Sequence, residues 1–236
     1  MGDKPDDIAW ANSATTTTDD ARLAATLRVT ETFYSLQGET SRCGLPTVFI
    51  RLTGCPLRCG YCDTAYAFSG GQTQTAAVVL EAVAQYRTRY VTVTGGEPLA
   101  QKNCHALLTL LCDRGYSVSL ETSGAIDVST VDARVSRILD IKTPGSGEVT
   151  KNVWENLDHL TAHDEIKFVI CDEADYLWAK EQIAARGLAD ICPVLVSPVY
   201  RDLEAARLAD WILRDQLTVR MQMQLHKQLW GEQRGR

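Results

Sequence analysis

An α/β fold built on an open, partial barrel of parallel strands is predicted by three features of this 236-residue chain. From residue 28 onward, short apolar runs alternate with helical patterns, which is typical of right-handed crossovers between parallel strands. The helical patterns repeat their apolar residues at a period near 3.6. Polar motifs directly follow several of the apolar runs, and active sites of such sheets lie at the carboxyl ends of the strands. Six or seven parallel strands favour an open barrel over a closed eightfold one.

The individual elements follow from these periods in chain order. Strands are expected at residues 27–33, 47–52, 90–94, 117–121, 138–142, 165–170, 194–197 and 218–225. Helices are expected at residues 76–87, 104–114, 174–186 and 203–214. Gly115 and Gly187 directly follow two of these helices, and glycine commonly ends a helix.

Composition bounds the domain organisation and the partners. Apolar residues make up 45% of the chain and charged residues 23%, as in ordinary globular proteins. The net charge of −6 argues against a nucleic-acid partner, because proteins that bind a phosphate backbone usually carry a basic surface. No apolar run approaches the ~20 residues that span a bilayer, so no membrane partner is expected. Residues 1–27 are polar and acidic and are expected to be a disordered extension, residues 28–230 the catalytic domain, and residues 231–236 a flexible tail.

Three cysteines lie close together in one loop, at Cys55, Cys59 and Cys62. Thiolates at such spacing ligate iron–sulfur clusters, and three of them leave one iron of a [4Fe–4S] cluster open to a cofactor. A structural zinc site is the alternative, but zinc usually takes two Cys/His pairs and no second pair follows. Iron–sulfur chemistry and unpaired cysteines predict a reducing, cytoplasmic location.

Polar residues share one face of four predicted strands, because side chains alternate along a strand. These sets are Arg51 and Thr53; Ser117, Ser119 and Glu121; Asp140 and Lys142; and Gln222, Gln224 and His226. Faces that converge would enclose a polar substrate cavity. The alternative is a solvated outer face, which a parallel sheet covered by helices usually lacks.

The motifs resemble those of a known family. The cysteine spacing, with Tyr61 before the third cysteine, resembles radical S-adenosylmethionine enzymes, and Gly95-Gly96-Glu97-Pro98 resembles the superfamily element that receives the methionine amino group. Three further segments resemble the 7-carboxy-7-deazaguanine synthase family across about residues 28–230. They are Leu36-Gln37-Gly38-Glu39, Cys62-Asp63-Thr64 and Gln224-Leu225-His226-Lys227.

This resemblance implies a reaction and its cofactors. The family converts 6-carboxy-5,6,7,8-tetrahydropterin to 7-carboxy-7-deazaguanine by a radical ring contraction with loss of ammonia, in queuosine and deazapurine biosynthesis. The implied cofactors are a [4Fe–4S] cluster, S-adenosyl-L-methionine and Mg²⁺. The implied partners are the small pterin substrate, a reductant protein such as a flavodoxin or ferredoxin, and a second copy of the chain in a homodimer.

The resemblance also assigns the site residues. Cys55, Cys59 and Cys62 are the expected cluster ligands, Thr64 the magnesium ligand, and Glu121 and His226 the catalytic residues. Cofactor binding is expected from Tyr61, Cys62, Asp63, Gly95, Gly96, Glu97, Asp140, Ile141, Lys142 and Ser197. Substrate binding is expected from Leu36, Gln37, Gly38, Glu39, Arg51, Thr94, Gln224 and His226. In three places the chain departs from the family's commoner pattern: the Asp140–Lys142 segment where Ser-Pro-Lys is usual, Thr40 where glycine is frequent, and the residues after Lys227.

Alternatives remain open for several residues and for the function. Arg51 offers a forked cation to the substrate carboxylate, or it forms a salt bridge with Glu39 or another acid. Glu121 faces the substrate, or it pairs with Lys142. Thr64 binds magnesium, or its hydroxyl caps the following turn. A glycyl-radical-enzyme activating enzyme would use the same cluster on a protein substrate, and a non-catalytic metal-binding or electron-transfer protein would use the cysteines alone.

Overall fold

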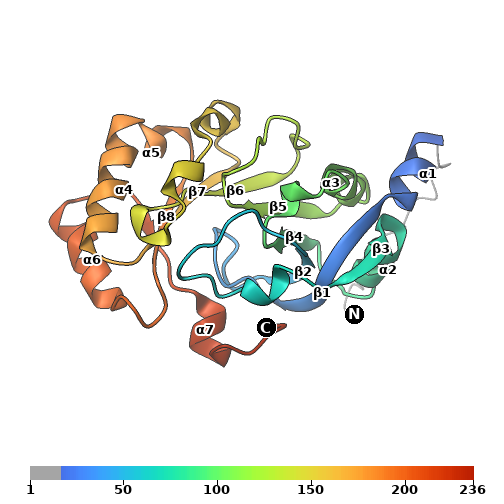
Figure 1. Cartoon of the computed structure of the whole chain (residues 1–236), viewed down its shortest axis with the longest axis horizontal. Coiled ribbons are helices and arrows are strands. Elements are labelled where there is room, and N and C mark those ends of the chain that lie inside the picture. Colours follow the sequence, from blue (N-terminus) through green and yellow to red (C-terminus); the bar gives the residue numbers. More distant parts are fainter. Residues whose placement is uncertain (1–16) are drawn as a thin grey trace, which may run out of the picture.

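Nine strands form one open sheet in the computed structural model, which describes residues 17–236 (Figure 1). The strand order is β3-β1-β2-β4-β5-β6-β7-β8-β9. From β2 to β9 every neighbouring pair is parallel, whereas β1 runs antiparallel to both β2 and β3. The predicted α/β architecture with an open parallel sheet is therefore confirmed.

The strands are β1 (Thr26–Leu36), β2 (Pro46–Leu52), β3 (Gln72–Thr75), β4 (Tyr90–Gly95), β5 (Ser117–Thr122), β6 (Ser136–Asp140), β7 (Glu165–Ile170), β8 (Val194–Pro198) and β9 (Arg220–Met221). The α-helices are α1 (Thr17–Ala24), α2 (Ala76–Ala84), α3 (Cys104–Asp113), α4 (Glu173–Ala185), α5 (Leu188–Ile191), α6 (Ala205–Arg214) and α7 (Leu225–Trp230). Single turns of 3₁₀-helix follow several strands, among them η1 (Ala65–Ala67) and η3 (Pro144–Ser146).

The two faces of the sheet differ in chemistry, as the alternation of side chains predicts. The outer face carries the hydrophobic core, with Ile50, Val93 and Leu120 fully buried beneath the helices. Helix α3 contacts β5 at the middle of the sheet, and helix α4 contacts β7 further along it, at the left of Figure 1. The polar side chains of the inner face line a central cavity.

The region after β8 differs from the expectation. A strand was expected over residues 218–225, but β9 has two residues, and the chain then turns into helix α7. The expected common face of Gln222, Gln224 and His226 is therefore wrong. The side chains of Gln222 and Gln224 form hydrogen bonds with Thr40 and Glu39, in the loop after β1, instead of sharing a strand face.

Strand β3 was not expected, because its four residues are all polar.

The ends of the chain also differ from the expectation. Residues 1–16 of the expected disordered extension lie outside the described residues. Residues 17–24 form helix α1, with Leu23 packed against the core, and β1 begins at Thr26. Disorder is therefore wrong for this part of the extension. Residues 231–236, expected to be flexible, lie along the mouth of the central cavity, and Arg234 lies 4.1 Å from the centre of the Tyr66 ring.

A loop over residues 37–45 closes the amino-terminal end of the open barrel. Its ends are joined by a backbone hydrogen bond from Gly44 to Gln37 (2.8 Å). The loop reaches across the barrel, where the Ser41 amide donates to the Glu165 carboxylate (3.1 Å) and Arg42 donates to the Ser117 carbonyl (3.0 Å). The loop thereby covers the amino-terminal end of the space inside the curved sheet, and we call it the floor.

Thr40 is the strained point of this loop. It is buried and has a φ of 65°, in the left-handed region that costs a β-branched residue about 1–2 kcal/mol. The Gln222 amide accepts from the Thr40 N–H and donates to the Thr40 carbonyl, both at 2.6 Å. One side chain thus satisfies both backbone groups, and a glycine at this position would adopt the same φ without strain.

We predict that Gln222→Ala lowers the free energy of unfolding by about 1–3 kcal/mol, because it leaves two buried backbone groups of Thr40 without partners. Chemical denaturation measures the change. The control is Gln228→Ala on the exposed side of α7, which should change stability by less than about 0.5 kcal/mol. Equal effects from the two substitutions would contradict the role given to Gln222.

Candidate active site

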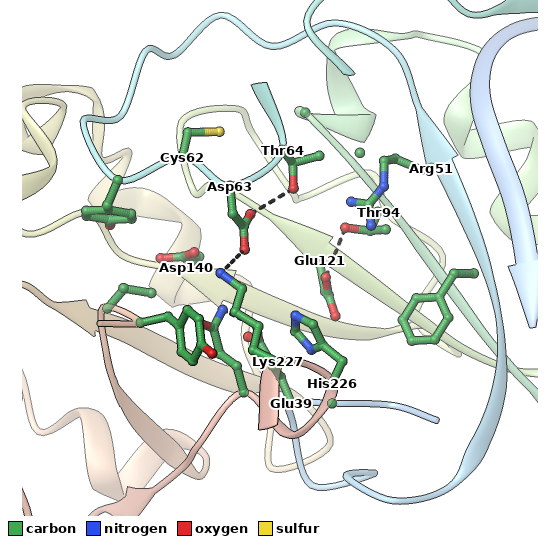
Figure 2. Close-up of a pocket in the computed structure, with 18 of the residues that line it drawn as sticks. Glu39, Arg51, Cys62, Asp63, Thr64, Thr94, Glu121, Asp140, His226 and Lys227 are labelled. Atoms are coloured by element: carbon green, nitrogen blue, oxygen red, sulfur yellow. Dashed lines mark hydrogen bonds and ion pairs between the residues drawn. The ribbon is translucent and has the colours of Figure 1, made fainter. Parts of the chain in front are cut away.

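The inner face of the sheet lines a cavity of about 620 Å³, into which Figure 2 looks. Five strands that are neighbours in the sheet contribute polar side chains to its wall. These are Arg51 from β2, Thr94 from β4, Glu121 from β5, Asp140 from β6 and Lys167 from β7. The cysteine loop forms one side of the cavity, the loop over residues 37–45 its floor, and α7 with the tail part of its rim. The predicted polar cavity is therefore present.

The three cysteines all line this cavity, in the loop between β2 and η1. The loop is held by neighbouring backbone: the Gly60 amide donates to the Ser146 carbonyl (3.0 Å). Burial raises the pKa of the Cys55 and Cys59 thiols, so a metal must displace their protons on binding.

Zinc and an iron–sulfur cluster need different arrangements of their ligands. Within residues 17–236, no three His, Cys, Asp or Glu side chains converge closely enough to hold one metal ion. Structural zinc needs four converging ligands. A four-iron cluster instead takes one thiolate at each of three irons, so its ligands need not meet at one point.

Gly95 and Gly96, at the end of β4, allow this strand to approach the end of β2 and the start of the cysteine loop closely. A Cβ on Gly95 would collide with the backbone oxygen of Leu52, and one on Gly96 with that of Gly54. Both glycines line the cavity as predicted, beside the cysteine loop. Their lack of side chains therefore serves first to pack β4 against the start of that loop.

Glu97 lies behind this wall rather than in it. Its carboxylate is fully buried and accepts hydrogen bonds from Leu99 N (2.9 Å), Thr122 Oγ1 (3.0 Å) and Ser123 N (2.6 Å). It is not among the residues that line the cavity. Cofactor binding by the Glu97 side chain was predicted from the motif, and it stays a prediction.

Three predicted cofactor residues hold buried polar atoms that find no partner within residues 17–236: the Tyr61 hydroxyl, Asp140 Oδ1 and Ser197 Oγ. Buried polar atoms are nearly always hydrogen-bonded. Tyr61 and Asp140 line the cavity, so their atoms fit a site where a polar molecule such as S-adenosylmethionine supplies the missing partners. Ser197 is not among the lining residues, and its contact with the cofactor stays a prediction. The other oxygen of Asp140 forms an ion pair with Lys142 at 2.9 Å.

Ile141 faces the other way. Its side chain is buried in the hydrophobic core on the outer face of the sheet, so it does not line the cavity. The predicted cofactor contact of Ile141 can involve only its backbone.

A hydrogen-bonded group of side chains forms the inner end of the cavity. Glu121 accepts from Thr94 Oγ1 (2.9 Å) and from Gln37 Nε2 (3.4 Å), and Gln224 Nε2 donates to Glu39 (2.9 Å). Figure 2 shows the bond between Thr94 and Glu121. The expected alternative pairing of Glu121 with Lys142 is wrong, because Lys142 pairs with Asp140.

The charges in this group favour different proton states for its two glutamates. Burial, and then the nearby Glu39 carboxylate, raise the pKa of Glu121. Burial alone would also raise the pKa of Glu39, but its ion pair with Lys167 outweighs burial and lowers it. Glu39 is therefore the fixed anion, and Glu121 is the carboxyl group that can hold a proton.

His226 lines the cavity from helix α7, above the floor (Figure 2). The Leu225 amide donates to the Gly38 carbonyl (2.9 Å), and a Cβ on Gly38 would collide with His226 Nδ1. Gly38 is therefore required for the ring to fit. Burial lowers the pKa of His226, which favours the neutral imidazole.

Asp63 ties the cysteine loop to the same helix. It forms an ion pair with Lys227 (2.6 Å) and accepts from Thr64 Oγ1 (2.8 Å), as Figure 2 shows. Burial opposes the charged form, but Lys227 and Thr64 lower the pKa of Asp63 to about 2. The Thr64 hydroxyl does not cap the turn that follows, so that alternative is wrong.

Arg51 forms the salt bridge that one interpretation expected, and its role in substrate binding stays a prediction. Its Nε donates to Glu31 (2.7 Å), so an acid does pair with it, although that acid is not Glu39. Arg51 nevertheless lines the cavity, with 16% of its side chain exposed.

Lys167 and Glu31 were missed by the sequence analysis. Lys167 lies on the cavity face of β7, where it pairs with Asp140 in register and forms an ion pair with Glu39. The alternation that identified Glu121 would also have identified Lys167 in the run 165–170. Glu31 carried no such signal, because its role depends on the register of β1 and β2.

Asp175 supports the cysteine loop from behind. This buried carboxylate accepts from Gly145 N (2.7 Å) and Thr143 Oγ1 (2.9 Å), and so holds the turn η3 whose Ser146 carbonyl binds Gly60. We predict that Asp175→Ala lowers the iron bound per chain after anaerobic reconstitution, measured by iron assay and visible absorbance. The free energy of unfolding should fall by about 1–3 kcal/mol.

The matched control for this prediction is Asp172→Ala, which removes the cap of the same helix α4 without touching η3. It should cost about 1 kcal/mol of stability and leave the iron content unchanged. Equal iron loss in both variants would show that the effect is general destabilisation.

We predict that Glu121→Gln raises the free energy of unfolding of the ligand-free chain at neutral pH. A carboxyl whose folded-state pKa is raised stabilises the fold below its ordinary pKa, and this contribution is lost as pH rises towards the folded-state value. The glutamine oxygen can still accept from Gln37, and the glutamine amide can donate to Thr94 Oγ1, so both contacts remain without the buried charge. Denaturation curves from pH 4 to 8 should show the gain growing with pH, and a constant or reversed difference would contradict the assigned pKa direction.

Comparison with known proteins gives a consistent result. Residues 49–143 match the family model described as the Radical SAM superfamily. The chain is 46% identical over 211 residues to 7-carboxy-7-deazaguanine synthase of Chlorobaculum tepidum, covering 88% of this chain and 96% of that protein. It is 42% identical over 219 residues to the enzyme of the same name from Koribacter versatilis, covering 86% of this chain and 97% of that protein.

Among solved structures, the crystal structure of QueE from Escherichia coli matches with a TM-score of 0.73, covering 90% of this chain and all of that one. Its sequence identity of 22% makes this a likeness of fold. No helix in the described part of the chain has the length and apolar character to cross a membrane. Given the extent of the two sequence matches, the chain belongs to the 7-carboxy-7-deazaguanine synthase family of radical S-adenosylmethionine enzymes.

Proposed function

We propose that this chain converts 6-carboxy-5,6,7,8-tetrahydropterin to 7-carboxy-7-deazaguanine with loss of ammonia, as a step of queuosine biosynthesis. One observation carries the proposal: a single cavity joins the cysteine loop on one side to Arg51, Glu39 and Glu121 on the other. A radical generated at the cysteine loop would therefore meet a substrate held by charged and hydrogen-bonding groups.

The cofactor end of the cavity is formed by the cysteine loop, the glycine pair and the end of β6. Cys55, Cys59 and Cys62 would hold the [4Fe–4S] cluster, and Tyr61 and Asp140, which line the cavity, would bond to S-adenosylmethionine through their unpartnered atoms. Ser197 would add a hydroxyl from β8. When bound, the reduced cluster and S-adenosylmethionine supply the radical that removes a hydrogen atom from the substrate. The protein's part is to hold both molecules side by side and to exclude water.

The substrate end suits a carboxylated pterin. Arg51 is the forked cation that would bind the carboxylate. Gln37, Glu39 and Gln224 offer the amide and carboxylate groups that read the donors and acceptors of the pterin edge. Leu36, Gly38 and Thr94 complete this end, and all of these residues line the cavity.

Glu121 and His226 are proposed to handle protons. Loss of ammonia requires that the departing nitrogen be protonated, and a raised pKa makes the Glu121 carboxyl group better able to hold such a proton. His226, neutral because burial lowers its pKa, can accept a proton from the ring. The two residues line the same cavity, so both can reach one bound substrate.

Four further features belong to the proposal. Mg²⁺ would bind at Thr64, and the substrate carboxylate and water molecules would complete its coordination shell. A flavodoxin-like or ferredoxin-like protein would reduce the cluster. The chain would act in the cytoplasm, as a homodimer.

We predict that the anaerobically reconstituted chain, given reductant, Mg²⁺, S-adenosylmethionine and 6-carboxytetrahydropterin, forms 7-carboxy-7-deazaguanine with little net consumption of S-adenosylmethionine. Mass spectrometry measures both. Cys59→Ala should abolish product, because one iron loses its ligand, whereas Cys112→Ala, on helix α3 away from the cavity, should keep it.

Abundant 5′-deoxyadenosine without product would contradict the proposed substrate while keeping the radical chemistry. That outcome would favour the alternative of an activating enzyme that acts on a protein. Product from the Cys59→Ala variant would contradict the cluster assignment itself.

A further inference from the structure

We propose that Glu31 and Tyr66 form a clamp that positions Arg51 for the carboxylate of the substrate, and that this clamp sets the preference for a carboxylated ring. The inference deepens the proposed function and rests on Arg51 being the carboxylate-binding residue. Glu31 begins the segment that runs to Glu39, but the family resemblance assigned no role to Glu31 or to Tyr66.

Three contacts fix the guanidinium of Arg51. Glu31 Oε1 accepts from Arg51 Nε at 2.7 Å, and the same oxygen accepts from the Tyr66 hydroxyl at 2.7 Å. The rings of Phe33 and Tyr66 each lie with their centres 5.8 Å from the Arg51 guanidinium carbon. The guanidinium is therefore bound at its inner nitrogen and flanked by two aromatic rings.

The contact pattern leaves the useful edge of Arg51 free. Within residues 17–236 no hydrogen bond engages Nη1 or Nη2, although Arg51 lines the cavity. A carboxylate is bound best by two parallel N–H groups of a guanidinium. By taking Nε, Glu31 fixes the plane of the fork without occupying the Nη1–Nη2 edge.

The fold holds each member of the clamp in place independently of ligand. Glu31 and Arg51 are paired in register across the antiparallel strands β1 and β2. Phe33 stacks on Phe49 with ring centres 5.0 Å apart, which fixes the apolar side. Tyr66 comes from η1, directly after the cysteine loop, so the clamp also ties Arg51 to the cofactor end of the cavity.

The proton states agree with this arrangement. The Tyr66 hydroxyl donates to Glu31 Oε1, because a phenol carries its proton at neutral pH. Glu31 then receives two hydrogen bonds on one oxygen and needs no partner from the substrate. The anion in the wall therefore does not compete for the substrate's place on Arg51.

The test compares two stable ligands, 6-carboxypterin and unsubstituted pterin, by calorimetry on the cluster-loaded chain with S-adenosylmethionine. We expect Glu31→Gln and Tyr66→Phe each to weaken 6-carboxypterin about tenfold, the size expected for a hydrogen bond to a charged group, and to leave pterin unchanged. In turnover, KM should rise with little change in kcat. The control is Tyr34→Phe, at an exposed tyrosine on β1, the strand that carries Glu31. It should change the affinity for neither 6-carboxypterin nor pterin.

A second cycle tests whether Glu31 acts through Arg51. Once Arg51→Leu has removed the carboxylate contact, adding Glu31→Gln should have no further effect on 6-carboxypterin. Equal weakening of both ligands, or an additive double variant, would overturn the clamp and leave the proposed function standing. A wild-type chain that binds neither pterin would overturn the proposed substrate and the clamp together.

Discussion

The pair of hydrogen bonds between the Gln222 amide and the backbone of Thr40 is the constraint on which the cavity depends. An open parallel sheet has no floor of its own, and the loop over residues 37–45 provides one only when it is held at the far side of the barrel. That loop carries Gln37 and Glu39 to within reach of Glu121 and Lys167. The strained φ of Thr40 is the local cost of this closure.

Closure brings charges into a confined space, and the site manages them by pairing. Lys167 neutralises Glu39, Lys142 neutralises Asp140, and Glu31 takes one nitrogen of Arg51. An unpaired buried charge would be costly, and each pair reduces that cost. At the substrate end of the described cavity wall, Glu121 forms no ion pair and has a raised pKa, and Arg51 keeps a free edge, so both groups can serve a ligand.

The sequence was sufficient for the parts of this structure that depend on local pattern. The parallel sheet, the cysteine loop after β2 and the placement of Glu121 and Asp140 on the cavity face all follow from short-range periodicity and spacing. The rest depends on contacts between distant segments. Gln222 seemed part of a strand because nothing local shows that its amide bonds to Thr40, 182 residues away. The Glu31–Arg51 pair depends likewise on strand register, and the burial of Glu97 on the turn after β5.

A crystal structure of the anaerobic chain with its cluster, S-adenosylmethionine and 6-carboxypterin tests the central claim most directly. The account predicts one cavity holding both molecules, with the pterin carboxylate on Nη1 and Nη2 of Arg51 and the Glu31–Arg51 bond intact. The ring should contact Gln37 and Glu121, and S-adenosylmethionine should contact Asp140 and Tyr61. A pterin bound outside this cavity, or a carboxylate held by residues other than Arg51, would contradict it.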